Sequence, residues 1–267
     1  MRNHIIYIGK PQGAAVAEGL TYFLLLYNPP IPTIPVTYTD LFIDFDDTLY
    51  DTHGNADIAL RELFDEQGFE RYFPRPQEFF DTYWRENLLL WAQYSRGEIT
   101  RDYLIVERFR RPLSLAEGLE PTREFCLQTS DRFLDLCASK PGLIPGARSL
   151  MAYLRERGYR LHMCSNGFHE VQYRKLRSCG LQDSFDTIIL SEDAGYNKPD
   201  VRFFEYALRQ TGAPLATTLM IGDNPDTDIT GARAAGLPTI YFNRTGRPAT
   251  VPCTYEVTSL EAIQSLL

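Results

Sequence analysis

The stretch Leu41-Phe42-Ile43-Asp44-Phe45-Asp46-Asp47-Thr48-Leu49-Tyr50 decides the fold of this chain. Its apolar first residues predict a short buried strand, and three carboxylates follow directly. Asp44 and Asp46 alternate, and two like charges about 4 Å apart repel by roughly 4 kcal/mol at an effective dielectric constant near 20. A hard divalent cation such as Mg²⁺ would relieve this repulsion, because it binds carboxylate and carbonyl oxygens and leaves room for a phosphate group. The alternative interpretation is a strand that ends in an acidic, solvated turn.

Three later segments also place polar residues close to apolar, strand-like runs. Ser165-Asn166-Gly167 follows the run 159–164, and a hydroxyl with backbone N–H groups at a strand end is suited to binding phosphate. Lys198 precedes a helical stretch, where an ammonium group can neutralise charge on a transferred phosphoryl group. Gly222-Asp223 ends another strand-like run, and further acids follow as far as Asp228. Each feature alone also fits an ordinary turn or surface residue, but their order after successive strands indicates one site.

In this order, the four segments resemble the four motifs of the haloacid dehalogenase-like hydrolase superfamily. The stretch Asp44–Thr48 matches the nucleophile motif, Ser165 the second motif, Lys198 the third, and the acids 223–228 the fourth. The resemblance covers about residues 37–267 and therefore nearly all of the chain beyond its N-terminal arm.

Three further stretches, Ser165–Phe168, Ser191–Gly195 and Asn197–Pro199, are similar to the branch of bacterial pyrimidine 5′-nucleotidases of the house-cleaning type. This resemblance implies hydrolysis of a small phosphomonoester, with a pyrimidine nucleoside 5′-monophosphate as the expected substrate. The alternatives are a phosphatase for phosphoglycolate or a sugar phosphate, a mutase or phosphonatase on the same fold, and a catalytically silent binding module. A haloacid dehalogenase is disfavoured, because that reaction has no use for a metal-bound acid pair.

The resemblance also implies a role for each motif residue. Asp44 is expected to attack phosphorus and form an aspartyl-phosphate, while Asp46 protonates the leaving oxygen and then activates water. Mg²⁺ is expected to be held by the Asp44 side chain, the Asp46 backbone carbonyl and Asp223. The residues expected to bind the phosphoryl group and the substrate are Ser165, Lys198, Phe45, Asn166 and Gly167. Thr48 and Asp228 are expected to support these ligands without binding the ion themselves, and direct ligation of the metal by Asp228 is the alternative.

Residues 52–138 separate the first predicted strand from the second, and their pattern is helical. Leu60, Leu63 and Phe64 recur at helical spacing, as do the residues of the stripe Phe80, Tyr83, Trp84, Leu88 and Trp91. The segment is therefore predicted to be an all-helical cap, inserted where the resembling family carries one. Large aromatic residues at this spacing favour a buried core over direct contact with substrate.

The core is predicted to consist of residues 38–51 and 139–267, in which strand and helix patterns alternate. This alternation predicts an α/β fold with a doubly wound, mainly parallel sheet of the Rossmann-like type. Strands are expected at 159–164, 186–190, 218–222, 237–242 and 254–257, and helices at about 168–179, 200–210, 225–235 and 259–266. Residues 1–37 are predicted to be a dispensable or disordered arm, and the apolar run 20–27 is too short to span a bilayer.

The composition fits an ordinary soluble enzyme, and the resemblance implies that its partner is a small phosphorylated metabolite. A formal net charge of −8 and a pI near 5.1 argue against general binding to nucleic acid or to an anionic membrane, because no basic surplus exists to neutralise phosphates. Five cysteines without close pairing favour a reducing cytoplasm over a disulfide framework. A chain of 267 residues can bury one core and a smaller accessory domain, and a monomer or homodimer is expected.

Overall fold

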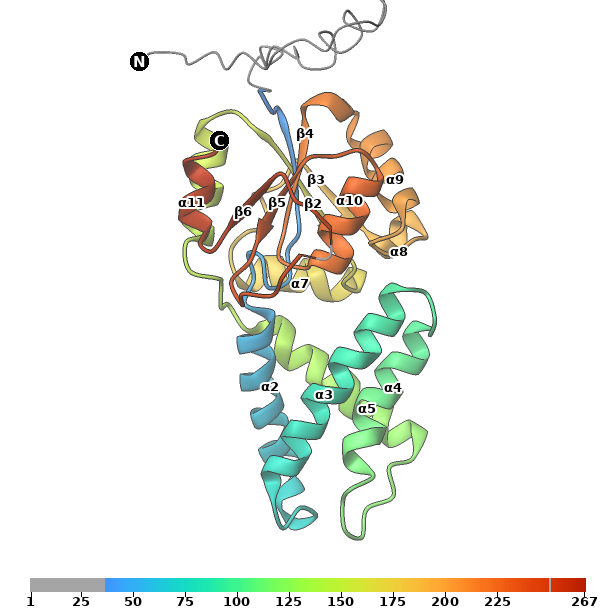
Figure 1. The fold of residues 1–267 in the computed structure, drawn as a ribbon. Helices are drawn as coiled ribbons and strands as arrows, with labels where there is room; N and C mark the ends of the chain where they lie inside the picture. The colour runs from blue at the N-terminus through green and yellow to red at the C-terminus, as the bar shows by residue number, and fades with distance from the viewer. Residues whose placement is uncertain (1–36, 250) are drawn as a thin grey trace, which may run out of the picture. The chain divides into compact units, whose positions relative to one another are not determined.

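The computed structural model describes residues 37–249 and 251–267, so the prediction for the N-terminal arm lies outside the described residues apart from Thr37. A single parallel sheet of six strands forms the core, in the order β3-β2-β1-β4-β5-β6 (Figure 1). The strands are β1 (Asp40–Ile43), β2 (Arg160–Ser165), β3 (Thr187–Leu190), β4 (Thr218–Gly222), β5 (Thr239–Phe242) and β6 (Tyr255–Val257). Every strand lies within two residues of its predicted position, and the predicted fold class is confirmed.

The register of the sheet gathers the motif residues at one edge. Ile43 of β1 pairs with Met163 of β2 on one side and with Ile221 of β4 on the other. The residues that follow these three positions therefore leave the sheet side by side at the carboxyl ends of the strands. Strand order reverses around β1, and such a switch point is where open α/β sheets bind their ligands.

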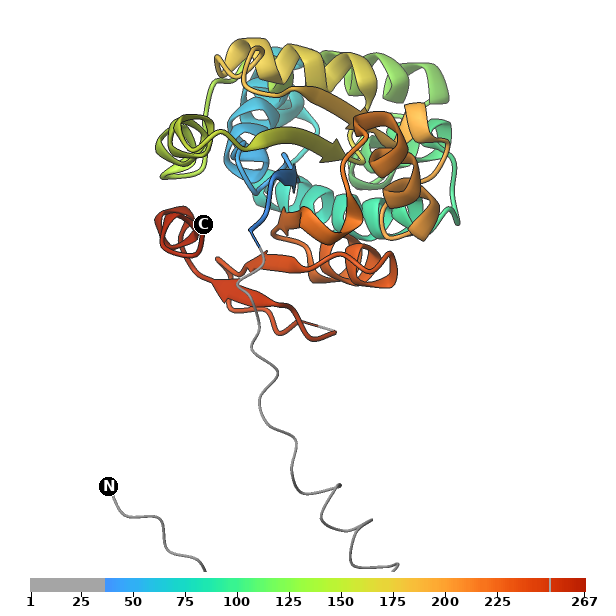
Figure 2. The same ribbon diagram turned by 90° about the horizontal axis from the view of Figure 1, so that it is seen from above.

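Helices cover both faces of the sheet, because the side chains of β1 alternate between two cores. Leu41 and Ile43 pack in a cluster with residues of α6 (Ala147–Glu156), α7 (His169–Ser178) and α11 (Leu260–Gln264). Phe42 faces the opposite cluster, which includes residues of α9 (Val201–Thr211) and α10 (Thr230–Ala234). Figure 2 shows α6 and α11 on one side of the sheet and α9 and α10 on the other. Full burial of each large apolar side chain stabilises the fold by about 1.5–3 kcal/mol.

The segment predicted to be helical is helical in the structure, and its division from the core as a cap domain stays a prediction. It contains α2 (Thr52–Glu66), the short 3₁₀ turn η1 (Phe69–Arg71), α3 (Pro76–Ser95), α4 (Arg101–Leu113) and α5 (Arg123–Ser139). These helices enclose a hydrophobic cluster of their own, in which Leu60, Leu63 and Phe64 are buried as expected. Residues 52–138 are called the cap.

The predicted stripe on α3 is wrong at Leu88, which is 72% exposed. The buried side chains of this helix include Tyr83, Leu90 and Tyr94. Leu88 follows Tyr83 by five residues, which turns it about 140° away from that face at 3.6 residues per turn. Trp84 and Trp91 are partly buried and pack at the edges of hydrophobic clusters.

The helix predicted at 225–235 begins differently from the expectation. Its first turn, η3 (Pro225–Ile229), is a π-helix, and α10 continues from it. The Asn224 carbonyl accepts hydrogen bonds from the N–H groups of Asp228 at 2.9 Å and Ile229 at 3.4 Å. Within the described part of the chain, no helix has both the length and the apolar character needed to cross a bilayer.

Candidate active site

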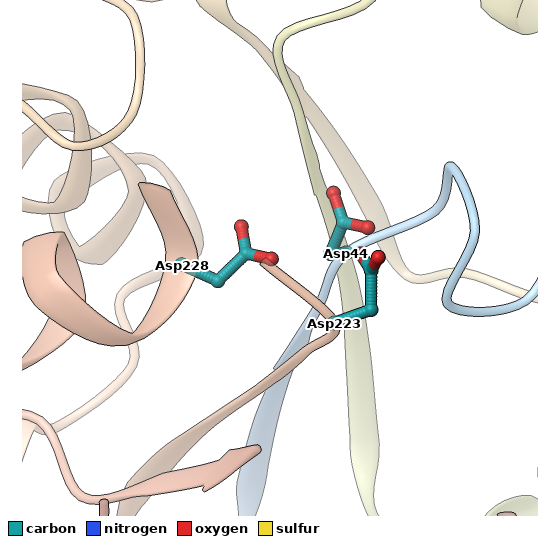
Figure 3. Close-up of side chains that lie close together, drawn as sticks. All are labelled: Asp44, Asp223 and Asp228. Atoms are coloured by element: carbon teal, nitrogen blue, oxygen red, sulfur yellow. The ribbon is translucent and has the colours of Figure 1, made fainter. Parts of the chain in front are cut away.

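Three carboxylates from separate parts of the fold meet at the carboxyl edge of the sheet (Figure 3). Asp44 follows β1, Asp223 follows β4, and Asp228 lies in η3. Each offers an oxygen atom, and these atoms all lie within 4.8 Å of one another. Gly222 makes this approach possible, because a Cβ atom at its position would lie only 2.3 Å from Asp228 Oδ2.

Lys198 lies among these acids and is only 2% exposed. Its Nζ atom donates hydrogen bonds of 2.7 Å to Asp44 Oδ1, to Asp228 Oδ1 and to the Cys164 carbonyl. Three acceptors therefore satisfy all three N–H donors of the ammonium group. Burial alone would lower the pKa of Lys198, but Asp228 and Asp44 raise it above its ordinary value, so the lysine is a fixed positive charge beside Asp44.

Thr48 and Asn224 hold all three of these acids in place. Thr48 Oγ1 lies 2.8 Å from Asp44 Oδ2 and 3.2 Å from Asp223 Oδ1, and it accepts the Asp223 N–H at 3.1 Å. The Asn224 N–H donates to Asp228 Oδ2 at 3.0 Å, so both oxygens of Asp228 already accept hydrogen bonds from the protein. This arrangement suits the supporting positions expected for Thr48 and Asp228.

The acids outnumber the lysine, and their pKa values reflect this surplus. Burial raises the pKa of Asp44 to about 7; Lys198 opposes the rise, while Asp228 and Asp46 add to it. Burial, together with the neighbouring Asp44 and Asp228, raises the pKa of Asp223 well above its ordinary value. A cation among the three carboxylates would stabilise their charged forms, and a donor set of oxygens alone fits a hard divalent ion such as Mg²⁺.

Asp46 points to a different set of partners. Its Oδ1 accepts hydrogen bonds from Lys175 Nζ at 2.6 Å and Thr52 Oγ1 at 2.5 Å. Its Oδ2 accepts from Gln172 Nε2 and, at 3.4 Å, from Ser165 Oγ. Burial alone would raise the pKa of Asp46, but Lys175 and these hydrogen bonds lower it. The predicted acid–base residue is thus held by donors from α7 and from the first residue of the cap.

Lys175, Gln172 and Thr52 are absent from the site predicted from the sequence. Gln172 and Lys175 are three residues apart on α7, so they share one face of the helix, and both are buried. The sequence contains a signal that could have identified them, because two polar residues at this spacing occupy one face of the helix just after the Ser165 motif. Gly167 makes room for Gln172, because a Cβ atom at position 167 would lie 1.9 Å from Gln172 Nε2.

The second and third motifs are joined through Asn166. Its Oδ1 accepts the Lys198 N–H at 2.8 Å, and its Nδ2 donates to the Lys198 carbonyl at 2.9 Å. The Asn166 side chain therefore fixes the backbone of Lys198. Ser165 Oγ accepts hydrogen bonds from the Gly167 N–H at 3.0 Å and from Gln172 Nε2 at 2.7 Å.

Phe45, the remaining predicted substrate contact, has a fully buried side chain that stacks on Tyr50 with ring centroids 5.4 Å apart. The ring is part of the hydrophobic core on the α6 side of the sheet. Only the backbone of Phe45 is therefore available to contact the substrate.

The ends of α3 and α4 reach the site from the cap. Asn197 Nδ2 donates to the Tyr94 carbonyl at 2.7 Å, and Asn166 Nδ2 lies 3.4 Å from Ser95 Oγ. Arg101, the first residue of α4, forms an ion pair of 2.7 Å with Glu192 of the core. Beside these contacts is a cavity of about 650 Å³, lined by residues 94–97 and by part of the segment 191–202, whose lining does not include Asp44, Asp46 or Asp223.

Comparison with known proteins agrees with this geometry. The HAD-hydrolase YfnB of Bacillus subtilis is 33% identical over 234 residues, which cover 86% of this chain and 95% of the relative. The pyrimidine 5′-nucleotidase YjjG of Escherichia coli is 33% identical over 232 residues, which cover 85% of this chain and 96% of the relative. The crystal structure of YfnB, described as bound to magnesium, matches 86% of this chain and 98% of its own with a TM-score of 0.78 and 30% identity.

A family model for haloacid dehalogenase-like hydrolases matches residues 41–236, which include all four motifs. The match extends over most of the chain and over the elements that carry the three carboxylates and the lysine. The chain therefore belongs to the haloacid dehalogenase-like hydrolase family.

Proposed function

We propose that this protein is a Mg²⁺-dependent phosphatase that cleaves small phosphomonoesters through an aspartyl-phosphate on Asp44. The observation that carries the proposal is the position of Asp44, which contacts the fixed ammonium group of Lys198 and lies in one cluster with the carboxylates of Asp223 and Asp228. A nucleophilic carboxylate beside a buried cation and a metal-binding set of oxygens suits attack on a phosphoryl group, whose oxygens carry negative charge.

Each residue of the site has its own role in the proposed reaction. Asp44 attacks phosphorus with one carboxylate oxygen, and the bond from phosphorus to the leaving oxygen breaks. Asp46 donates a proton to that oxygen and then takes a proton from the water that hydrolyses the aspartyl-phosphate. Ser165 and Lys198 bind the phosphoryl oxygens, and the backbone N–H groups near Asn166 and Gly167 help to orient them.

Asp44, Asp223 and the Asp46 carbonyl would hold Mg²⁺, with Asp228 and Thr48 supporting these ligands. When bound, the ion supplies positive charge that screens the phosphate from the carboxylates around it. The magnesium named for the YfnB structure supports this assignment. The raised pKa values of Asp44 and Asp223 also support it, because they mark a cluster with too few positive charges.

The proposed substrates are pyrimidine nucleoside 5′-monophosphates. The names of two relatives at 33% identity, YjjG and PynA of Streptococcus pneumoniae, support this choice. Other relatives, at 30% and 31% identity, are named as phosphoserine and glyceraldehyde 3-phosphate phosphatases, so the substrate has to be measured.

A panel of phosphorylated metabolites, scored by release of phosphate in the presence of Mg²⁺, tests the proposal. We expect dUMP, UMP and dTMP to have a higher kcat/KM than phosphoglycolate and hexose phosphates. The generic substrate p-nitrophenyl phosphate serves as the control for phosphatase chemistry. Preference for a sugar phosphate would reject the nucleotide while leaving the phosphatase in place, and inactivity with every phosphomonoester would reject both.

A further inference from the structure

A positive charge is buried inside the cap without an acidic partner. Arg108 of α4 is only 2% exposed, and its Nε and Nη2 atoms donate to a single hydroxyl, Ser130 Oγ, at 3.0 and 2.6 Å. Across residues 37–249 and 251–267, no carboxylate lies within ion-pair distance of Arg108, and its neighbour Glu107 pairs with Arg110 and Arg111 instead. The guanidinium also lies over the rings of Phe109 and Phe133, 5.7 and 5.3 Å from the ring centroids, and Asp131 acts on its charge only from beyond ion-pair distance. Buried charges are costly unless they are paired, so a ligand group that accepts hydrogen bonds from Arg108 would be favoured here.

An unpaired acceptor lies on the helix that packs beside Arg108. The Oδ1 atom of Asn87 in α3 is buried and has no hydrogen-bond partner in the described part of the chain. Asn87 follows Tyr83 by four residues, so both lie on one face of α3. Tyr83 is close to Arg108, because its ring lies 5.4 Å from the Phe133 ring and the Arg108 guanidinium lies 5.3 Å from that same ring. The cap interior therefore contains a charged donor group without an ion pair and an unused acceptor atom, on two neighbouring helices.

This part of the cap borders the catalytic site. The Cys137 carbonyl of α5 accepts a hydrogen bond from the Tyr50 hydroxyl at 2.9 Å, and Lys175 Nζ lies 5.1 Å from the centroid of the Tyr50 ring. Cys137 is thus near the lysine that holds Asp46, and it follows Ser130, the partner of Arg108, by two turns of α5. On α3, Tyr94 contacts Asn197, two turns further along the helix from Asn87.

We propose that Arg108 and Asn87 bind the leaving group of the substrate through the imide edge of uracil or thymine. The inference rests on the proposed function and specifies how its substrate class is recognised. Uracil and thymine present two carbonyl oxygens with an N–H group between them. The guanidinium donates to a carbonyl oxygen, and Asn87 Oδ1 accepts the N–H. An anionic leaving group would pair with Arg108 but would leave the Asn87 oxygen facing a negative charge, so the base fits the pair better.

The variant Arg108→Met tests the proposal. Exchange of an unpaired buried charge for an apolar side chain of similar length is often neutral or stabilising, so we expect an unchanged or higher Tm. The ratio of kcat/KM for dUMP to that for p-nitrophenyl phosphate should fall by about 10- to 100-fold, because hydrogen bonds to a charged group are lost only with the base. Asn87→Leu should lower the same ratio. Arg110→Met, which removes an exposed charge from the same helix, is the matched control and should leave the ratio unchanged.

Two results would overturn this assignment. The first is an equal loss for both substrates in Arg108→Met, and the second is a wild type that cleaves p-nitrophenyl phosphate but none of dUMP, UMP and dTMP. The second result also leaves the phosphatase chemistry intact. If the wild type cleaves neither class, the proposed function fails, and calorimetry then decides the cap site separately. In that case the Asp44→Asn variant should bind dUMP, and the double variant that also carries Arg108→Met should bind it more weakly. Equal affinities of the two variants for dUMP would overturn the proposed cap site.

Discussion

Lys175 Nζ lies 2.6 Å from Asp46 Oδ1, although the two residues are 129 positions apart in the sequence. The Lys175 side chain is 10% exposed and that of Asp46 is 27% exposed, so the pair is shielded from much of the solvent. It connects α7 to the residue proposed as the acid and base of the reaction. The opposite end of the same carboxylate is held by Gln172, one turn earlier on α7.

We expect Lys175→Met to slow the reaction most for substrates whose leaving oxygen needs a proton. Without the ammonium group, Asp46 loses the partner that orients it, and acid–base catalysis contributes about 10²- to 10⁴-fold in enzymes. The kcat for nucleotides should therefore fall by at least about tenfold, and that for p-nitrophenyl phosphate should fall less, because nitrophenolate leaves readily without a proton. Arg177→Met, at an exposed position on α7, is the control; equal losses for both substrates would contradict the orienting role.

The variant Asp44→Asn is expected to abolish turnover while the protein stays folded. The exchange is nearly isosteric, and it removes one acid from a cluster in which burial and like charges raise the pKa of Asp44 to about 7. The thermal midpoint should therefore remain the same or rise slightly. Phosphate release and a thermal unfolding curve measure the two effects, and full activity in this variant would falsify the nucleophile assignment.

Removal of divalent ions with a chelator should silence the wild type, and added Mg²⁺ should restore it. Asp223→Ala should require a much higher concentration of Mg²⁺, because it removes one of three carboxylates that meet at the site. Asp226→Ala is the matched control: its side chain is 50% exposed and pairs with Arg247 outside the cluster. Titration of activity against Mg²⁺ compares the two variants. An equal rise in the Mg²⁺ concentration that each requires would show that Asp223 had been wrongly assigned as the metal ligand.

We expect the stability of the fold to depend on pH through His162 of β2, away from the catalytic edge of the sheet. Its Nε2 lies 3.1 Å from Asp40 Oδ1, and its buried Nδ1 has no partner among the described residues. Burial lowers the pKa of His162 below 6.5, although Asp40 opposes this effect. The unfolded chain therefore binds a proton more readily than the folded protein. The stabilising contribution is complete above the unfolded pKa of about 6.5 and is lost as the pH falls towards the folded pKa.

Urea midpoints measured at about pH 7.5 and about pH 5.5 test this dependence. The wild type should be less stable at the lower pH, by at most about 1.4 kcal/mol for each unit of pKa difference. His162→Gln should reduce the difference between the two midpoints. His169→Gln, at an exposed position on α7, should leave the difference as it is in the wild type. An identical pH dependence in His162→Gln and the wild type would refute the prediction.

The sheet and the positions of the four motifs follow from local patterns in the sequence. Short apolar runs such as 218–222 end in turn residues and acids, and this local pattern predicts a buried strand wherever it occurs. Strands that alternate with helices must pair in parallel, so their carboxyl ends meet at one edge. Asp44, Ser165 and Asp223 therefore come together for reasons that can be read along the chain.

The side chains that form hydrogen bonds and ion pairs with those residues depend, in contrast, on how distant segments pack in the fold. Asp46 pairs with Lys175 because α7 docks beside β1 with one particular face inward, and the direction of that face depends on packing across the whole core. In the same way, Leu88 is exposed because it points about 140° away from Tyr83 on α3, beyond the face that the neighbouring helices cover. Arg108 has the sequence context of a surface arginine, and only the folded cap shows it buried without an acid. Local periodicity reports which residues can be buried, whereas their partners depend on contacts between segments far apart in the chain.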